Sequence, residues 1–173
     1  SVIHHTFNPG DITPPNDEES IYNAFKIPEK NAIEAALYVS NEQKLHDKVT
    51  VQYGLRYSLF ENIGPGQVFQ YDEDFETIID TVFYDRFEKI KLYHGLEPRF
   101  SINYKVKDKN AIKTTYNRTR QYLHLISNST VSSPLDIWVP SDPYIKPQLA
   151  DQVALGYFRN FMDNKLEASV EIY

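Results

Sequence analysis

Hydrophobic and polar residues alternate along residues 48–60 of the chain. Because successive side chains of a β-strand point to opposite faces, this pattern predicts a strand with one apolar face and one polar face. Such a strand spans roughly 43 Å at about 3.3 Å per residue, whereas strands of soluble proteins commonly have about 5–6 residues. The apolar face carries Val49, Val51, Tyr53, Leu55, Tyr57 and Leu59, and the polar face carries Lys48, Thr50, Gln52, Gly54, Arg56 and Ser58.

Further segments show the same alternation, and together they predict seven strands. The gaps between the strands are alternately long and short, so consecutive hairpins place every tight turn at one edge and every long loop at the other. Outer-membrane barrels sort their connections in this way, whereas Greek-key sandwiches do not. The further segments are 2–8, 31–41, 95–107, 110–122, 151–162 and 165–173, and the gaps are 9–30, 42–47, 61–94, 108–109, 123–150 and 163–164.

A lipid bilayer explains both the strand length and the sorted loops. Hydrocarbon cannot hydrogen-bond a backbone, so only helices and closed sheets cross it, and a crossing strand needs about 9–11 tilted residues. We therefore predict short periplasmic turns, long extracellular loops, an apolar face against lipid and a polar face toward the lumen. The alternative is a half-buried sheet of a soluble β-sandwich binding module. That alternative requires a second layer of this chain over Val51, Leu55, Phe100 and Ile102.

Composition agrees with an all-β chain: 14% of the residues are aromatic and 13 are Tyr. The formal net charge of -6 argues against a nucleic-acid partner, and the absence of Cys excludes disulfides and thiol nucleophiles. No apolar run approaches the roughly 18 residues of a transmembrane helix, and no signal peptide is visible. Both ends fall inside strands and the strand number is odd, so we expect residues 1–173 to be part of one barrel domain, truncated at both ends.

The chain resembles the barrel region of TonB-dependent outer-membrane receptors of the Bacteroidetes type. The resemblance covers nearly the whole chain and is weakest over residues 11–20 and 67–91. It is carried by Leu96-Glu97-Pro98-Arg99, Tyr116-Asn117-Arg118, Gln121-Tyr122-Leu123-His124-Leu125, Asp136-Ile137-Trp138-Val139-Pro140, Lys146-Pro147-Gln148, Gly156-Tyr157-Phe158-Arg159-Asn160, Tyr53-Gly54-Leu55-Arg56-Tyr57 and the segment from His5 to Gly10.

The resemblance implies a barrel of roughly 22 strands, closed by a plug domain that is not part of this sequence. Such receptors lie in the outer membrane of Gram-negative bacteria and take up scarce nutrients with energy delivered through TonB. The implied partners are TonB, outer-membrane lipid and, in related glycan importers, a surface lipoprotein. Siderophores, glycans, peptides and cobalamin derivatives remain open as ligands. A barrel with a structural or secretion role is the other alternative.

Catalysis and metal binding find no support in the sequence. His4 and His5 are adjacent on a strand and point to opposite faces, which makes a poor metal pair. The acidic run 72–74 lacks the glycine and the ligand spacing of a calcium loop and is expected to be a solvated loop. No nucleophile–base pair is present. We therefore expect a protein that is not an enzyme and has no cofactor or bound metal.

Ligand contact is expected from loops or from lumen-facing residues. In the loop 123–150, an aromatic side chain beside carboxylates could stack on and hydrogen-bond a sugar, although Trp138 could equally pack the loop onto its neighbour. On the polar face, charged residues are expected to contact the plug, each other or a ligand. Arg118 and Arg159 interrupt apolar faces and are expected near the loop-side rim. The loop candidates are Trp138, Tyr144, Asp136 and Asp142, and the lumen candidates are Arg56, Glu97 and Arg99.

Overall fold

The computed structural model describes residues 1–8, 11–12, 25–26, 28–126, 137–162 and 165–173. Within these residues all regular structure is β-strand, and no helix is long and apolar enough to cross a bilayer. The main sheet has seven strands whose spatial order follows the chain, and every neighbouring pair is antiparallel. These strands are β1 (Val2–Phe7), β4 (Lys30–His46), β5 (Val49–Ile63), β8 (Lys89–Lys107), β9 (Asn110–Gln121), β12 (Gln148–Phe161) and β13 (Leu166–Ile172).

The seven predicted strands are confirmed, but several are longer than the alternation indicated. β4 continues to His46, so the expected loop 42–47 is strand except at its last residue. Apart from Leu45, the residues of this extension are polar, so no alternation marks them, yet their pairing with β5 continues with one register shift near Lys44. β8 begins at Lys89, well before the predicted start at residue 95.

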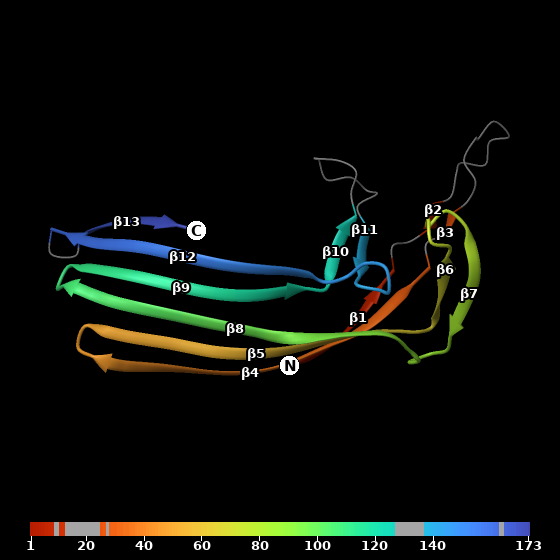
Figure 1. The fold of residues 1–173 in the computed structure, drawn as a ribbon, viewed down its shortest axis with the longest axis horizontal. Helices are drawn as coiled ribbons and strands as arrows, with labels where there is room; N and C mark the ends of the chain where they lie inside the picture. The colour runs from red at the N-terminus through yellow and green to blue at the C-terminus, as the bar shows by residue number, and fades with distance from the viewer. Residues whose placement is uncertain (9–10, 13–24, 27, 127–136, 163–164) are drawn as a thin grey trace, which may run out of the picture.

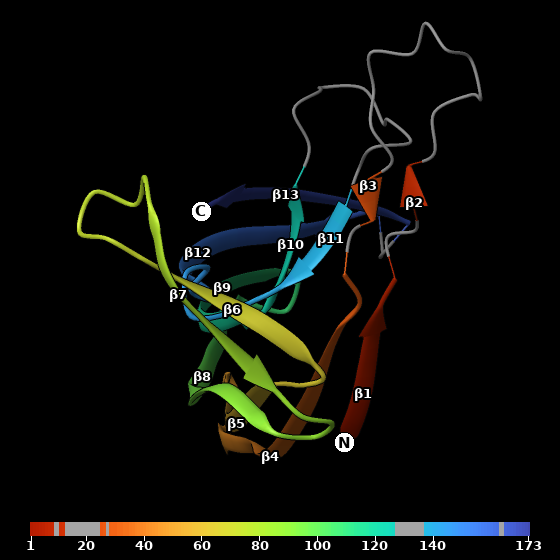
Figure 2. The ribbon, with the colours of Figure 1, turned by 90° about the vertical axis from the view of Figure 1, so that its right-hand side faces the viewer.

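The main sheet curls into an arc that forms part of a barrel wall. Viewed along the strands, β1 and β13 lie at the two ends of the arc and do not pair with each other (Figure 2). The tight connections after β4, β8 and β12 lie together at one end of the molecule, and the long connections lie at the other (Figure 1). This sorting is the one that the gap lengths predicted.

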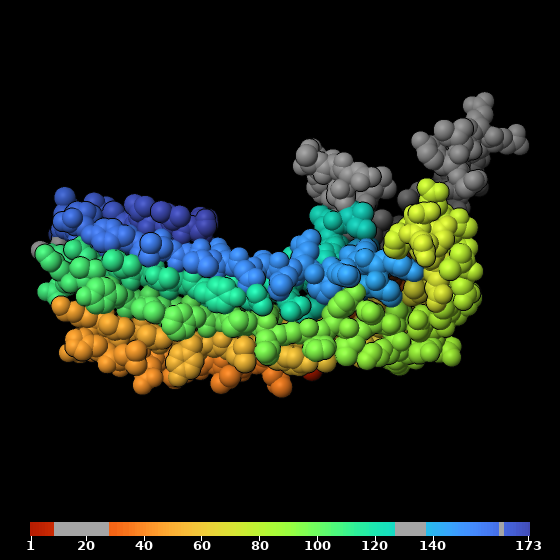
Figure 3. Space-filling view, viewed as in Figure 1, coloured from red at the N-terminus to blue at the C-terminus, as the bar shows by residue number. Residues whose placement is uncertain are grey.

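The long connections contain three short hairpins that the sequence analysis assigned to loops. β10 lies inside the arc, and its first residues follow directly from β9 (Figure 2). The hairpin of β6 and β7 turns across the loop end and forms a raised block there (Figures 1 and 3). The pairs are β2 (Asp11–Ile12) with β3 (Phe25–Lys26), β6 (Gly66–Tyr71) with β7 (Ile78–Tyr84), and β10 (Leu123–Ile126) with β11 (Ile137–Pro140).

The apolar face of the main sheet points outward and has no second layer over it. Leu55 is 41% exposed and Phe100 42%, and both belong to a row of exposed apolar residues on the outer face. The buried hydrophobic residues of the described chain are few: Ala32, Ala36, Phe60, Ile63 and Tyr122. The total accessible surface is 13180 Å², whereas a compact monomer of this mass exposes roughly 8,800 Å². The second layer that a soluble β-sandwich requires is therefore missing from the described residues.

One positional expectation was wrong. Arg159 pairs with Asn110, the first residue after the tight turn between β8 and β9, so it lies at the short-turn end of β12 rather than at the loop-side rim. The alternation predicted the face of β12 on which Arg159 lies, but not its position along the strand, because that position depends on the direction in which β12 runs. Arg118 lies nearer the loop end of β9, as expected, and forms a bidentate ion pair with Asp151 at 2.7 and 2.8 Å.

Candidate functional site

The inner face of the sheet carries a chain of ionic and polar contacts across neighbouring strands. Arg56 of β5 lies opposite Glu97 of β8 in the register, and its Nη1 donates to Glu97 Oε2 at 3.3 Å. Its Nη2 donates to Glu34 Oε1 of β4 at 3.4 Å. Glu97 is completely buried, and burying a carboxylate is costly unless it is paired and hydrogen-bonded. The pairing with Arg56 meets that requirement.

The same chain of contacts continues to both sides. Ser58 donates from Oγ to Glu97 Oε1 and lies 2.8 Å from the hydroxyl of Tyr122, which follows β9. The ring of Tyr122 stacks on Phe60 with centroids 4.9 Å apart. On the other side, His5 of β1 contacts Glu34 at 3.3 Å. The network therefore joins the wall strands to each other and fixes the start of β10 against them.

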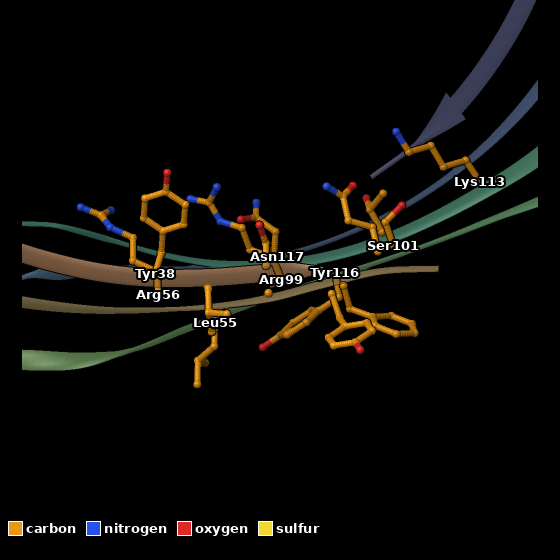
Figure 4. Close-up of a pocket in the computed structure, with 15 residues that line it drawn as sticks. Tyr38, Leu55, Arg56, Arg99, Ser101, Lys113, Tyr116 and Asn117 are labelled. Carbon is orange, nitrogen blue, oxygen red and sulfur yellow. The ribbon is translucent and has the colours of Figure 1, made fainter. Parts of the chain in front are cut away.

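Beside this network lies an open hollow of about 690 Å³, whose lining residues come from both faces of the sheet. Arg99, Ser101, Lys113 and Asn117 lie on its polar side with Arg56, while Leu55 points to the opposite face of the sheet (Figure 4). Among the described residues, neither Arg99 nor Lys113 has an ion-pair partner. The hollow therefore offers two cations together with amide and hydroxyl groups, a combination suited to carboxylate or phosphate groups.

Asp142 organises the loop that leads into β12. Its Oδ1 accepts the amides of Tyr144 and Ile145 at 3.0 and 2.9 Å, which closes a tight turn. Its Oδ2 pairs with Lys30 at 3.0 Å, and its backbone oxygen accepts the hydroxyl of Tyr93 at 2.8 Å. These contacts join the loop to β4 and β8, so Asp142 has a structural role at this position.

Tyr144 packs against the β6–β7 hairpin. Its ring meets Tyr71 and Phe75 edge-on, with centroids 5.5 and 6.2 Å apart, and its hydroxyl donates to the backbone oxygen of Phe69. A smaller hollow of about 320 Å³ lies between this loop and β6, with Lys30 and Asp142 on its wall.

The structure brings together some of the predicted residues and separates others. Arg56 and Glu97 pair directly, and Arg99 lies beside them without a described partner. Asp142 and Tyr144 share one turn, whereas Trp138 lies on β11 and is 52% exposed. Asp136 lies outside the described residues. The functional roles predicted for these residues stay predictions.

The sequence pattern did not identify several residues of the inner network. Ser58 was placed on a polar face, but nothing in the pattern singled out Ser58 or Glu34. Tyr122 looked like the last residue of a strand. The signal that joins them is the strand register, because residues opposite each other on one face become neighbours.

The described residues contain no group of three or more His, Asp or Glu side chains that could hold a metal ion. The acidic run 72–74 lies at the turn between β6 and β7, where Asp72 Oδ1 accepts the amides of Glu76 and Thr77 at 2.9 and 3.2 Å. Hydrogen bonding from the Thr77 amide is the main cause that lowers the pKa of the Asp72 carboxyl below its ordinary value. Asp72 therefore closes the turn as an anion.

Comparison with known proteins identifies the family. A family described as "Outer membrane protein beta-barrel family" matches residues 6–173, which is nearly the whole chain. No curated protein and no solved structure matches the chain. The chain belongs to the outer membrane protein β-barrel family, and its location is the outer membrane.

Proposed function

We propose that this member of the outer membrane β-barrel family is part of the wall of a TonB-dependent receptor that takes up a scarce nutrient and catalyses no reaction. The observation that carries the proposal is the polar inner face, where Arg99 and Lys113 face an open hollow without an ion-pair partner in the described residues. In a receptor whose lumen is filled by a plug domain, the plug supplies partners for such side chains. A water-filled structural barrel supplies only solvent. The sequence resemblance to TonB-dependent receptors supports the same function.

In this proposal the wall and the loops have separate tasks. The long connections at the loop end capture the nutrient from outside, and the β6–β7 and β10–β11 hairpins narrow the opening through which it passes. Arg99 and Lys113 hold the plug through its acidic groups. Glu97 is paired within the wall and is not available to the plug, so its task is to keep the strands in register. TonB, acting on the plug from the periplasm, opens the passage.

The experiment compares three strains of the source bacterium: wild type, a deletion of the full gene and a deletion of TonB. Each strain is grown with a ferric siderophore, a cobalamin or an oligosaccharide as the only source of the limiting nutrient. We expect one nutrient for which both deletions abolish growth, and for which Arg99→Met with Lys113→Met in the full protein weakens uptake. A gene deletion that causes envelope or secretion defects independent of TonB, with uptake of all three nutrients unchanged, would contradict the proposal.

A further inference from the structure

The β6–β7 hairpin exposes large apolar side chains at the loop end of the molecule. Apolar exposure on the outer face of the sheet is explained by lipid, but this hairpin stands beyond the sheet at the end of the long connections (Figures 1 and 3). Contiguous apolar surface exposed to water usually marks an interaction site. The exposed fractions are 67% for Phe75, 51% for Ile78, 65% for Ile79, 73% for Phe83 and 60% for Phe87.

The spacing along β7 places two of these apolar residues, Ile79 and Phe83, on one side of the hairpin. Ile79 and Phe83 are four residues apart on β7, so their side chains share a face by alternation. Gln67 of β6 lies opposite Phe83 in the register and is also exposed. The neighbouring turns carry Phe75 and Phe87 at the two ends of β7.

Acidic residues are interspersed with these apolar residues along the sequence of the hairpin. Residues 72–88 contain seven Asp or Glu residues and one basic residue, Arg86, which lies over the ring of Phe87 at 5.0 Å. None of the seven acids forms an ion pair with a described residue. The hairpin therefore combines exposed apolar side chains with acidic residues that have no ion-pair partner among the described residues, a combination suited to a protein–protein interface with a strong charge preference. The seven acids are Asp72, Glu73, Asp74, Glu76, Asp80, Asp85 and Glu88.

Contacts within the chain hold the hairpin in place without a partner. Its base is fixed where the Gly64 amide donates to the oxygen of Glu88 and the Phe87 amide donates to the oxygen of Gly64. Its tip is closed by Asp72, and its side is fixed by the hydroxyl of Tyr144. Phe75 and Phe87 adopt φ values of 59° and 64°, a left-handed conformation that is strained for bulky residues. A surface ordered in this way avoids part of the entropic cost of binding.

We propose that the β6–β7 surface docks a polypeptide whose contact region combines apolar and basic side chains. Charge distinguishes this partner from nucleic acid and from lipid headgroups. The acidic residues of the hairpin repel the phosphate groups of nucleic acid and of the outer leaflet. The proposal does not depend on nutrient uptake, because any barrel of this family with this hairpin would present the same surface.

The test places a photocrosslinking residue in the full-length protein in living cells. Phe83→benzoylphenylalanine probes the centre of the surface, and Asp47→benzoylphenylalanine in the tight turn at the opposite end is the control. Adducts are identified by mass spectrometry. The Phe83 probe is then repeated with Glu73→Gln, Asp74→Asn and Glu76→Gln combined, a change that spares the turn-closing Asp72, and separately with Ile79→Ser.

We expect the Phe83 probe to form an adduct with a separate polypeptide, through a segment that carries Lys or Arg. Ile79→Ser should reduce its yield roughly tenfold, because truncating a central interface residue commonly costs that much affinity. The three neutralising substitutions should also reduce the yield, because they remove the charge attraction to the basic partner. The adduct should persist in cells without TonB, so its outcome is independent of the uptake test. The proposal is overturned by adducts only with other loops of the same barrel, by adducts with lipid, by an adduct insensitive to both substitution sets, or by no adduct.

Discussion

At the scale of single residues, the buried carboxylate of Glu97 decides how the inner face tolerates change. Among the described residues it has one cationic partner, Arg56, and it accepts the hydroxyl of Ser58, which in turn contacts Tyr122. Replacing Arg56 would leave the buried Glu97 carboxylate with only a neutral hydrogen-bond donor. Removing one partner of a buried ion pair costs more stability than removing one partner of an ion pair at the surface. We therefore expect the Arg56–Glu97 pair to matter more for the stability of the wall than for contact with a ligand.

The substitution Arg56→Met in the full-length protein should destabilise the barrel by about 2 kcal/mol, because it leaves the buried Glu97 carboxylate without its cation. The partial exposure of Arg56 keeps the cost below that of a fully buried pair. Adding Glu97→Gln should recover part of that loss, because the stranded charge is removed. Thermal unfolding followed by the gel mobility of the folded barrel measures both effects. Lys105→Met is the control: it removes an exposed cation of β8 that has no ion-pair partner among the described residues, and it should cost less than about 0.5 kcal/mol. Equal losses for Arg56→Met and Lys105→Met would show that the Arg56–Glu97 pair does not stabilise the barrel.

Two glycines at the base of the β6–β7 hairpin provide a matched pair of positions. A Cβ on Gly64 would lie 2.2 Å from the backbone oxygen of Asp85, whereas a Cβ on Gly66 would meet nothing within 4 Å. Gly64→Ala should therefore cost about 1–3 kcal/mol through overpacking, and Gly66→Ala should be nearly neutral. Protease cleavage of the hairpin in intact cells reports the difference. If both variants are cleaved at the wild-type rate, the close approach at Gly64 is not required.

At the scale of elements, alternation could predict the wall strands because one of their faces meets lipid and must be apolar along its whole length. It could not predict the end of β4, where Leu45 is the one apolar residue in a polar run, or β10, which has only four residues. The same limit applies to the candidate site. Arg56 and Glu97 could be placed on one face, but their contact depends on the register, and a shift of one residue would turn Glu97 outward.

The contacts at the loop side could not be predicted from the sequence for a different reason. Lys30 and Asp142 are separated by 112 positions, and they meet only because the turn before β12 folds back onto β4. Asp142 and Tyr144 were selected as ligand contacts on residue type alone. The structure shows that the carboxylate closes its own turn and that the Tyr144 hydroxyl holds β6. Residue type identified a real cluster, but not the contacts that its members make.

The turn of the β6–β7 hairpin should depend on pH through Asp72. Because the pKa of this carboxyl is lowered in the folded protein, the anion stabilises the turn above the ordinary value near 3.8, and the stabilisation is lost as the pH falls through the lower folded value. Hydrogen exchange of the Glu76 and Thr77 amides, corrected for the intrinsic pH effect, should accelerate in that window. In Asp72→Asn the corrected exchange should not change with pH. A transition well above 3.8 in the wild type would contradict this role.

At the scale of the whole molecule, the decisive feature is how little of the chain is buried against itself. The hydrophobic cluster of Ala32, Phe60 and Tyr122 lies at the loop end of the inner face, while the larger apolar surface covers the outside of the arc. A protein built in this way is stable only when hydrocarbon covers that outer surface. The bilayer therefore replaces the second layer of a soluble sandwich, and the inner face is left for polar contacts.

This division between faces predicts that an introduced Arg is costly on the outer face and tolerated on the inner face. Leu55 lies at the middle of the outer row of β5, so Leu55→Arg should destabilise the folded barrel in lipid by about 2–4 kcal/mol. Gln52→Arg, three residues earlier on the inner face, should cost less than about 1 kcal/mol, because the lumen solvates the charge. Unfolding of the full-length protein in lipid vesicles measures both. If Gln52→Arg proves more costly than Leu55→Arg, the face assigned to the lumen meets lipid and the orientation of the wall is reversed.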